Sequence, residues 1–171
     1  KMIDYKNLNI KKKHKGAVVA IGNFDGLHSG HRKVLKEASQ EAKNKKLKFG
    51  IITFEPVPIM FFNKDIQNHR INSLDQKIFF LKKNKIDFLI IVNFNKSFSN
   101  LSAESFVKNI LFKKIKSKYI FISRNFKFGK KRLGNVKTLK NLEEKYSFKT
   151  VVTIPYKNKN KIVSSSLIRK V

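Results

Sequence analysis

The chain alternates short apolar runs with longer segments in which apolar residues recur every three or four positions. The apolar runs predict five buried strands, which lie at 17–22, 48–54, 87–94, 118–122 and 150–154. The longer segments predict four helices, which lie at 27–45, 74–84, 103–112 and 136–146. Ser73 and Ser102 are the expected N-caps of the second and third helices. This alternation predicts an α/β fold, in which helices cover both faces of a parallel sheet of about five strands.

The loops after the strands are the expected place for functional residues. In parallel sheets, ligands bind beyond the carboxyl ends of the strands, where the strand order reverses. Here those loops are 22–31, 54–66, 94–101, 123–135 and 155–166. A length of 171 residues without an internal repeat indicates one domain.

The net charge of +28, from 39 basic and 11 acidic residues, first suggests a polyanionic partner. The composition weakens that interpretation, because 34 of the basic residues are Lys and only five are Arg. Lys, Asn, Ile and Phe, all encoded by A/T-rich codons, together make up 86 of the 171 residues. The Lys residues are also scattered, whereas Arg is the usual reader of bases and clamp of phosphates. We therefore expect no nucleic-acid partner.

The absence of Cys excludes disulfides, a zinc ribbon and a cysteine nucleophile. The longest apolar run, at 88–92, is far shorter than the roughly 18 residues of a membrane span. Residues 1–6 also lack the apolar core of a signal peptide. We therefore expect a cytoplasmic protein without a membrane partner.

The most specific local signal is the loop Gly22-Asn-Phe-Asp-Gly-Leu-His-Ser-Gly-His31. Its glycines allow a tight turn and close approach of a ligand to the backbone. His28 and His31 fall on one face of the first turn of the following helix, where free N–H groups favour an anion. The loop therefore predicts polyphosphate binding without a Walker-type lysine loop.

Two other interpretations of this loop remain open. Asn-Phe-Asp-Gly is a good turn and His an acceptable cap, so the segment is also compatible with a purely structural role. Asp25, His28 and His31 together could supply a metal site of two His and one carboxylate.

The loop resembles the G-N-F-D-G-x-H-x-G-H signature of the HxGH nucleotidyltransferase superfamily. Five further motifs occur in the order found in the FMN adenylyltransferase module of bacterial bifunctional riboflavin kinase/FAD synthetases. They are T-F-E-P at 53–56, R-I-N-S-L-D-Q-K at 70–77, L-S-A-E-S-F at 101–106, N-F-K-F-G at 125–129 and V-S-S-S-L-I-R at 163–169. The resemblance implies a Rossmann-like fold of the nucleotidyltransferase type and an FMN adenylyltransferase domain over residues 1–171.

The resemblance further implies the reaction ATP + FMN → FAD + pyrophosphate, with Mg²⁺ as cofactor. It implies His28, His31 and Arg169 as catalytic residues and Asp25 as an aid to Mg²⁺ placement. The residues it implies for ATP binding are Gly22, Asn23, Phe24, Asp25, Gly26, Gly30, Ser164, Ser165 and Ser166. Those it implies for FMN binding are Phe54, Pro56, Phe62, Asn125, Phe126, Phe128 and Gly129. The basic stretch 127–132 is expected to attract the FMN phosphate.

The sequence departs from the family pattern at several places. Val57 replaces the His of T-F-E-P-H-P, and Ser123 replaces the Gly of V-G-x-[DN]-F. We expect Ser123 and Arg124 to crowd or retune the flavin site. The chain ends one turn into a helix predicted from Ser164, and the riboflavin kinase barrel that normally follows is absent from it.

Two rival functions remain open beside FMN adenylylation. One is another HxGH nucleotidyltransferase with a different acceptor, such as pantetheine phosphate or nicotinate mononucleotide. The other is a non-catalytic descendant that binds flavin or RNA.

Overall fold

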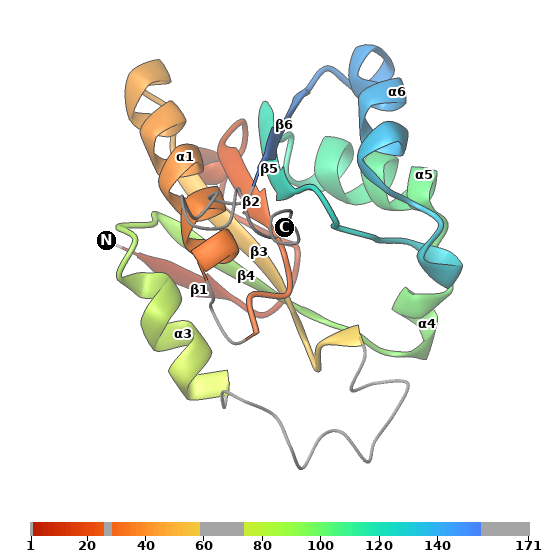
Figure 1. Ribbon diagram of the computed structural model, residues 1–171, viewed down its shortest axis with the longest axis horizontal. Coiled ribbons are helices and arrows are strands. Elements are labelled where there is room, and N and C mark those ends of the chain that lie inside the picture. Colours follow the sequence, from red (N-terminus) through yellow and green to blue (C-terminus); the bar gives the residue numbers. More distant parts are fainter. Residues whose placement is uncertain (1, 26–28, 59–73, 155–171) are drawn as a thin grey trace, which may run out of the picture.

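The computed structural model describes residues 2–25, 29–58 and 74–154 and shows one six-stranded parallel sheet (Figure 1). The strands are β1 (Ile3–Tyr5), β2 (Val18–Ile21), β3 (Phe49–Glu55), β4 (Phe88–Asn93), β5 (Tyr119–Ser123) and β6 (Lys149–Thr153). Their spatial order is β1-β4-β3-β2-β5-β6, and every pairing is parallel.

Helices cover both faces of this sheet (Figure 1). One face packs against α1 (Ser29–Lys45) and α3 (Leu74–Lys82). The other face packs against the π-helical segment η3 (Phe106–Lys114) and α6 (Val136–Tyr146). Shorter elements complete the described chain: η1 (Lys12–His14), α4 (Lys96–Ser99), α5 (Ala103–Ser105) and η4 (Lys130–Arg132).

The central strand β2 shows why the strands are apolar throughout. Successive side chains of a strand point to opposite faces of the sheet. Val18 and Ala20 pack in the core under α1 and α3, whereas Val19 and Ile21 pack in the core under η3 and α6. All four side chains are buried, because this sheet exposes neither face at its centre.

The structure confirms the predicted α/β class, the five predicted strands and the four predicted helices. It also confirms Ser102 as an N-cap, since its Oγ accepts a hydrogen bond of 3.1 Å from the Ser105 amide. Ser73 lies outside the described residues. The third predicted helix begins as α5 and continues with π-helical spacing in η3.

The sixth strand, β1, was not predicted. It is only three residues long, and its Ile-Asp-Tyr sequence contains no apolar run. It is an edge strand of the sheet and pairs with β4, with Ile3 opposite Phe88 and Tyr5 opposite Ile90. A short strand of mixed polarity at a sheet edge leaves no periodic signal in the sequence.

The strand order reverses at β2. From this strand the chain builds outward to β3 and β4 on one side, and later to β5 and β6 on the other. The loops after β2 and β5 therefore meet at the carboxyl edge of the sheet, which is where such folds bind ligands. Within the described ranges, no helix is long and apolar enough to cross a membrane.

Candidate functional site

A first cavity, which we call the switch-point cavity, opens where the loops after β2 and β5 meet. It is lined by Ile21, Gly22, Asn23, Phe24, Gly30, His31, Val34, Ser123, Arg124, Asn125, Phe126, Lys127 and Arg132. The structure thus brings the described part of the glycine-rich loop and the start of α1 to one wall. Residues at the end of β5 and in the loop after it complete the lining.

The glycine-rich loop is anchored to the carboxyl end of β3. The Gly22 amide donates to the Ile52 carbonyl at 3.2 Å, and Thr53 Oγ1 donates to the Asn23 carbonyl at 3.1 Å. Gly22 also fits a steric need, because a Cβ there would lie 3.0 Å from the Phe24 ring. These contacts fix the loop where it leaves the sheet.

The buried side chain of Phe24 anchors the loop in the core. Its backbone is left-handed, with φ 49°, and its side chain is only 1% exposed. The ring meets the His31 imidazole edge to face, with 5.4 Å between ring centroids. The sequence placed Phe24 among the ATP-binding residues; in the structure its ring packs in the core and against His31, and the residue also lines the switch-point cavity.

A second cavity, which we call the aromatic cavity, opens beside the first. It is lined by Asn23, Phe54, Pro58, Phe94, Phe98, Ser99, Leu101, Phe106, Lys127, Phe128, Gly129, Lys131 and Arg132. Its five Phe rings form a chain of contacts, in which neighbouring ring centroids are 5.4 to 6.4 Å apart. The walls are therefore apolar, and cationic side chains contribute to the lining beside them.

The loop after β5 needs its two glycines. Gly129 has φ 80°, and a Cβ there would lie 2.8 Å from the Ala103 backbone. At Gly134 a Cβ would lie 2.8 Å from the Phe128 ring and carbonyl, with which this residue forms an antiparallel bridge. The Lys130 amide donates to the Leu101 carbonyl at 2.8 Å, which ties the loop to the segment before α5.

The two cavities adjoin. Asn23, Lys127 and Arg132 line both of them. The side chains of Lys127 and Arg132 are exposed, and neither forms an ion pair with a described residue. A polyanion that spans the two cavities would therefore meet two cations at the junction.

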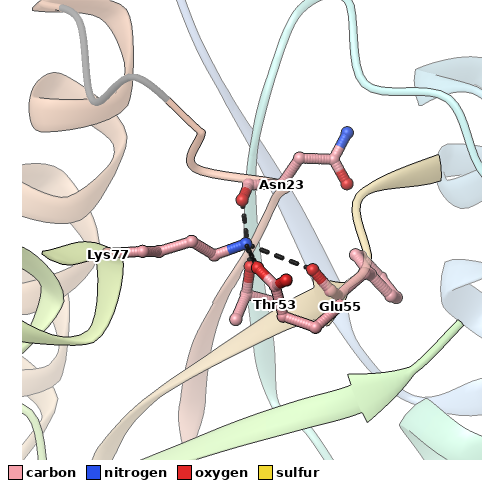
Figure 2. Close-up of polar contacts among 5 residues, drawn as sticks. Asn23, Thr53, Glu55 and Lys77 are labelled. Atoms are coloured by element: carbon pink, nitrogen blue, oxygen red, sulfur yellow. Dashed lines mark hydrogen bonds and ion pairs between the residues drawn. The ribbon is translucent and has the colours of Figure 1, made fainter. Parts of the chain in front are cut away.

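A buried lysine braces the carboxyl end of β3 (Figure 2). Lys77 of α3 has no exposed side-chain surface, and its Nζ donates to the Phe54 carbonyl at 3.1 Å and to Glu55 Oε2 at 2.9 Å. Figure 2 shows its side chain pointing toward Asn23, Thr53 and Glu55. A fully buried ammonium requires such partners, because desolvation of an isolated charge is very costly.

No role was predicted for Lys77 from the sequence, although this residue ends one of the family motifs. A signal was present, because Leu74, Lys77, Ile78 and Leu81 have the i, i+3, i+4, i+7 spacing of a core-facing helical stripe. A lysine in such a stripe must find a buried partner. The aromatic cavity had a weaker signal, since Phe94, Phe98 and Phe106 look like ordinary core residues.

The structure distributes the predicted flavin residues over both cavities. Phe54, Phe128 and Gly129 line the aromatic cavity, whereas Asn125 and Phe126 line the switch-point cavity. The lining of neither cavity includes Pro56. Ser123 and Arg124, expected to affect the flavin site, line only the switch-point cavity, because they lie at the end of β5 beside β2.

Several predicted residues lie outside the described residues: Gly26, His28, Phe62, Ser164, Ser165, Ser166 and Arg169. Asp25 is described and does not line either cavity. Among the described residues, no three His, Asp or Glu side chains are grouped to hold a metal ion.

The fold and the site together define a class of protein. A glycine-rich loop leads from the central strand of a parallel sheet into a helix, and a cavity lies at the switch point. This arrangement is that of a doubly wound α/β protein that binds its ligand, commonly a nucleotide, at the switch point.

The sequence match narrows the class to one family. Residues 10–167 match the family described as FAD synthetase. The chain therefore belongs to the FAD synthetase family.

Curated relatives agree with this assignment. A bifunctional riboflavin kinase/FMN adenylyltransferase from Buchnera aphidicola (subspecies Schizaphis graminum) is 43% identical over 164 residues, which cover 95% of this chain and 52% of the relative. The protein of the same description from Escherichia coli K12 is 30% identical over 155 residues, which cover 91% of this chain and 50% of the relative. This chain thus spans about half the length of these relatives.

Solved structures show the same fold. A Streptococcus pneumoniae protein described as a macrolide-efflux protein superposes with a TM-score of 0.77 at 23% identity, over 99% of this chain and 55% of that one. A pantoate-beta-alanine ligase from Francisella tularensis superposes with a TM-score of 0.54 at 18% identity, over 99% of this chain and 76% of that one. At these identities the likeness is one of fold alone.

Proposed function

We propose that this chain is an FMN adenylyltransferase domain, which transfers AMP from ATP to FMN and yields FAD and pyrophosphate. The observation that carries the proposal is the junction of the two cavities at Asn23, Lys127 and Arg132. The aromatic cavity suits a flat isoalloxazine ring, because its Phe rings offer burial and stacking. The switch-point cavity suits ATP, because it combines a helix start with polar loops.

The reaction needs positioning more than acid–base chemistry. A phosphate oxygen of FMN attacks the α-phosphorus of ATP, a new P–O bond forms, and the bond to the departing pyrophosphate breaks. The second pKa of a phosphomonoester is about 6, so near neutral pH the nucleophile is already ionised. The protein must therefore hold two polyanions together and stabilise the negative charge that develops.

The proposed roles follow from this need. His31, held by Phe24 at the start of α1, contacts the ATP phosphates together with His28. Ser164, Ser165 and Ser166 bind the terminal phosphates, and Arg169 stabilises the charge on the departing pyrophosphate. Asn23 lies between the substrates and contacts phosphate through its amide or backbone.

The chemistry of Asp25 suits Mg²⁺, although this residue lines neither cavity. Mg²⁺ usually retains several waters and binds through one or two carboxylates together with substrate phosphates. Asp25, within the glycine-rich loop, is a carboxylate of the right chemistry for this mode. Bound there, Mg²⁺ would neutralise phosphate charge.

The test is a scan of acceptors with the purified chain, ATP and Mg²⁺. FMN should yield FAD and pyrophosphate, whereas pantetheine phosphate and nicotinate mononucleotide should yield no adenylylated product. Turnover of one of these other acceptors in preference to FMN would replace the proposal by its closest rival. Absence of all turnover from protein with a native circular dichroism spectrum would overturn it and favour a non-catalytic binder.

A further inference from the structure

Two adjacent cations of the loop after β5 have a left-handed backbone. Lys131 and Arg132, two adjacent residues other than glycine, have φ 55° and 54°. The left-handed region costs such residues about 1–2 kcal/mol each. Strained residues of this kind concentrate at functional sites. Strain at Lys131 and Arg132 is therefore a reason to infer a functional role for this part of the loop.

The cations of this loop are not equivalent. Arg124 lines the switch-point cavity alone, and Lys131 lines the aromatic cavity alone. Lys127 and Arg132 line both, and Lys130 lines neither. Of the two shared cations, only Arg132 carries a planar fork of donors that can bind two phosphate oxygens at once.

We propose that Arg132 is a catalytic residue, whose guanidinium bridges the attacking phosphate of FMN and the α-phosphate of ATP. This role of Arg132 rests on the proposed function. It identifies the group that holds the two reacting phosphates together. Arg132 carries no ion pair with a described residue that it would have to break. Lys127, at the same junction, adds a second positive charge that offsets the repulsion between the substrates.

The bridging role of Arg132 predicts effects on both the affinity for FMN and the rate of the chemical step. A group that contacts both phosphates stabilises the transition state more than either separate substrate, so its loss lowers kcat as well as the affinity for FMN. Riboflavin has the same ring system without the phosphate. Its affinity should therefore not depend on Arg132.

The experiment compares Arg132→Met, Arg132→Lys and Lys137→Met with the unmodified chain. Arg132→Met should lower kcat/KM by about 100-fold or more, as removal of one transition-state donor does elsewhere. It should also weaken FMN binding by roughly tenfold, as the loss of a charge-assisted contact does, while riboflavin binding remains unchanged. Arg132→Lys should recover part of kcat, because the charge returns without the fork. Lys137→Met removes the same charge from an exposed position on α6 that lines neither cavity, and it should retain normal turnover.

The outcomes separate this proposal from the one on which it rests. If the unmodified chain does not form FAD, the proposed function has failed whatever the variants do. If it forms FAD and Arg132→Met turns over normally, only the bridge is overturned. Equal losses of FMN and riboflavin binding in Arg132→Met would also overturn it, because they would show damage to the cavity itself.

Discussion

The two adjoining cavities are lined by different kinds of residue. The switch-point cavity is formed largely by short loops at the carboxyl ends of β2 and β5, with glycines, polar side chains and a helix start. The aromatic cavity is walled by five Phe rings that come from β3, the loop after β4, α4, η3 and the loop after β5. A ligand in the first is held mainly by directed polar contacts and charge, and a ligand in the second mainly by burial.

This difference has a structural consequence at β3. Thr53 donates to the carbonyl of Asn23, which lines both cavities, and Phe54 lines the aromatic cavity. Lys77 donates hydrogen bonds to the Phe54 carbonyl and to the Glu55 carboxylate. One strand end therefore positions parts of both cavities, and one buried lysine braces that end.

The largest expected effect comes from removing this brace. Lys77→Met should destabilise the chain by about 3–5 kcal/mol, because loss of one partner of a buried ion pair leaves its counterpart poorly compensated. Any folded fraction should bind both ATP and FMN more weakly. Urea unfolding gives the free energy, and calorimetry gives the two affinities.

The matched control is Lys82→Met in the same helix. Lys82 pairs with Asp4 at 3.3 Å, and both side chains are well exposed. Such a pair contributes at most about 1 kcal/mol. If Lys77→Met cost no more than Lys82→Met, the brace would have no special role.

The next effect distinguishes the cavities directly. Phe128→Leu keeps most of the apolar volume and removes an aromatic face of the second cavity. Aromatic contacts are worth about 0.5–1.5 kcal/mol, so the KM for FMN should rise by roughly two- to tenfold. The KM for ATP should remain within about twofold, since the ring does not line the switch-point cavity. Steady-state kinetics with each substrate varied in turn measures both.

Phe79→Leu is the control for that substitution. Phe79 lies on α3 with 61% of its surface exposed, outside the lining of either cavity. It should leave both KM values unchanged. Equal changes in the two KM values of Phe128→Leu would contradict the separation of the cavities.

Ionic strength should affect ligand binding in the two cavities differently, without any substitution. Raising the ionic strength from about 0.1 to about 1 M shortens the screening length from roughly 10 to 3 Å. ATP binding should weaken severalfold, whereas binding of riboflavin, which carries no phosphate, should change little. Titration calorimetry at both salt concentrations tests this, and equal weakening of both ligands would show that charge governs the aromatic cavity too.

The smallest predicted effect is a dependence of the free energy of unfolding on pH. It sets the pH range in which the variants above can be compared. His14 is buried, accepts or donates a 2.8 Å hydrogen bond with Tyr5 Oη through Nδ1, and stacks on Phe88 at 4.6 Å. Burial is the main cause that lowers its pKa below the ordinary value of 6.5. The unfolded chain therefore binds this proton more readily than the folded one.

The contribution of His14 to stability should be complete above pH 6.5 and fall as the pH drops below it. Its slope should not exceed about 1.4 kcal/mol per pH unit, the limit for one proton. Urea unfolding between pH 5 and pH 8, roughly the range in which His titrates, should show a shallower slope in His14→Gln. An unchanged slope would place the acid sensitivity elsewhere.

The sequence predicted the sheet better than it predicted the site. Buried strands such as β4, with five buried residues in six, and the capped α6 carry strong local signals. The switch-point loop was also visible, because Gly22, Phe24 and His31 are close in sequence. The edge strand β1 lacked such a signal, since only Tyr5 of its three residues is buried.

The aromatic cavity and the brace depend on contacts between distant segments. Phe54 and Phe98 are neighbours only after β3 and α4 have met, so no local pattern separates them from core residues. Lys77 could be recognised as unusual from its place in an apolar stripe. Its partners, Phe54 and Glu55, are 22 or 23 residues away and emerge only from the tertiary structure.

The most direct test of the account uses ATP radiolabelled at the α-phosphorus, together with FMN and Mg²⁺. If the two cavities bring the FMN phosphate to that phosphorus, the label appears in FAD and the pyrophosphate is unlabelled. A parallel reaction with the label at the γ-phosphorus should give labelled pyrophosphate and unlabelled FAD. Absence of label from the flavin product in the first reaction, with folded protein that binds both substrates, would contradict the account.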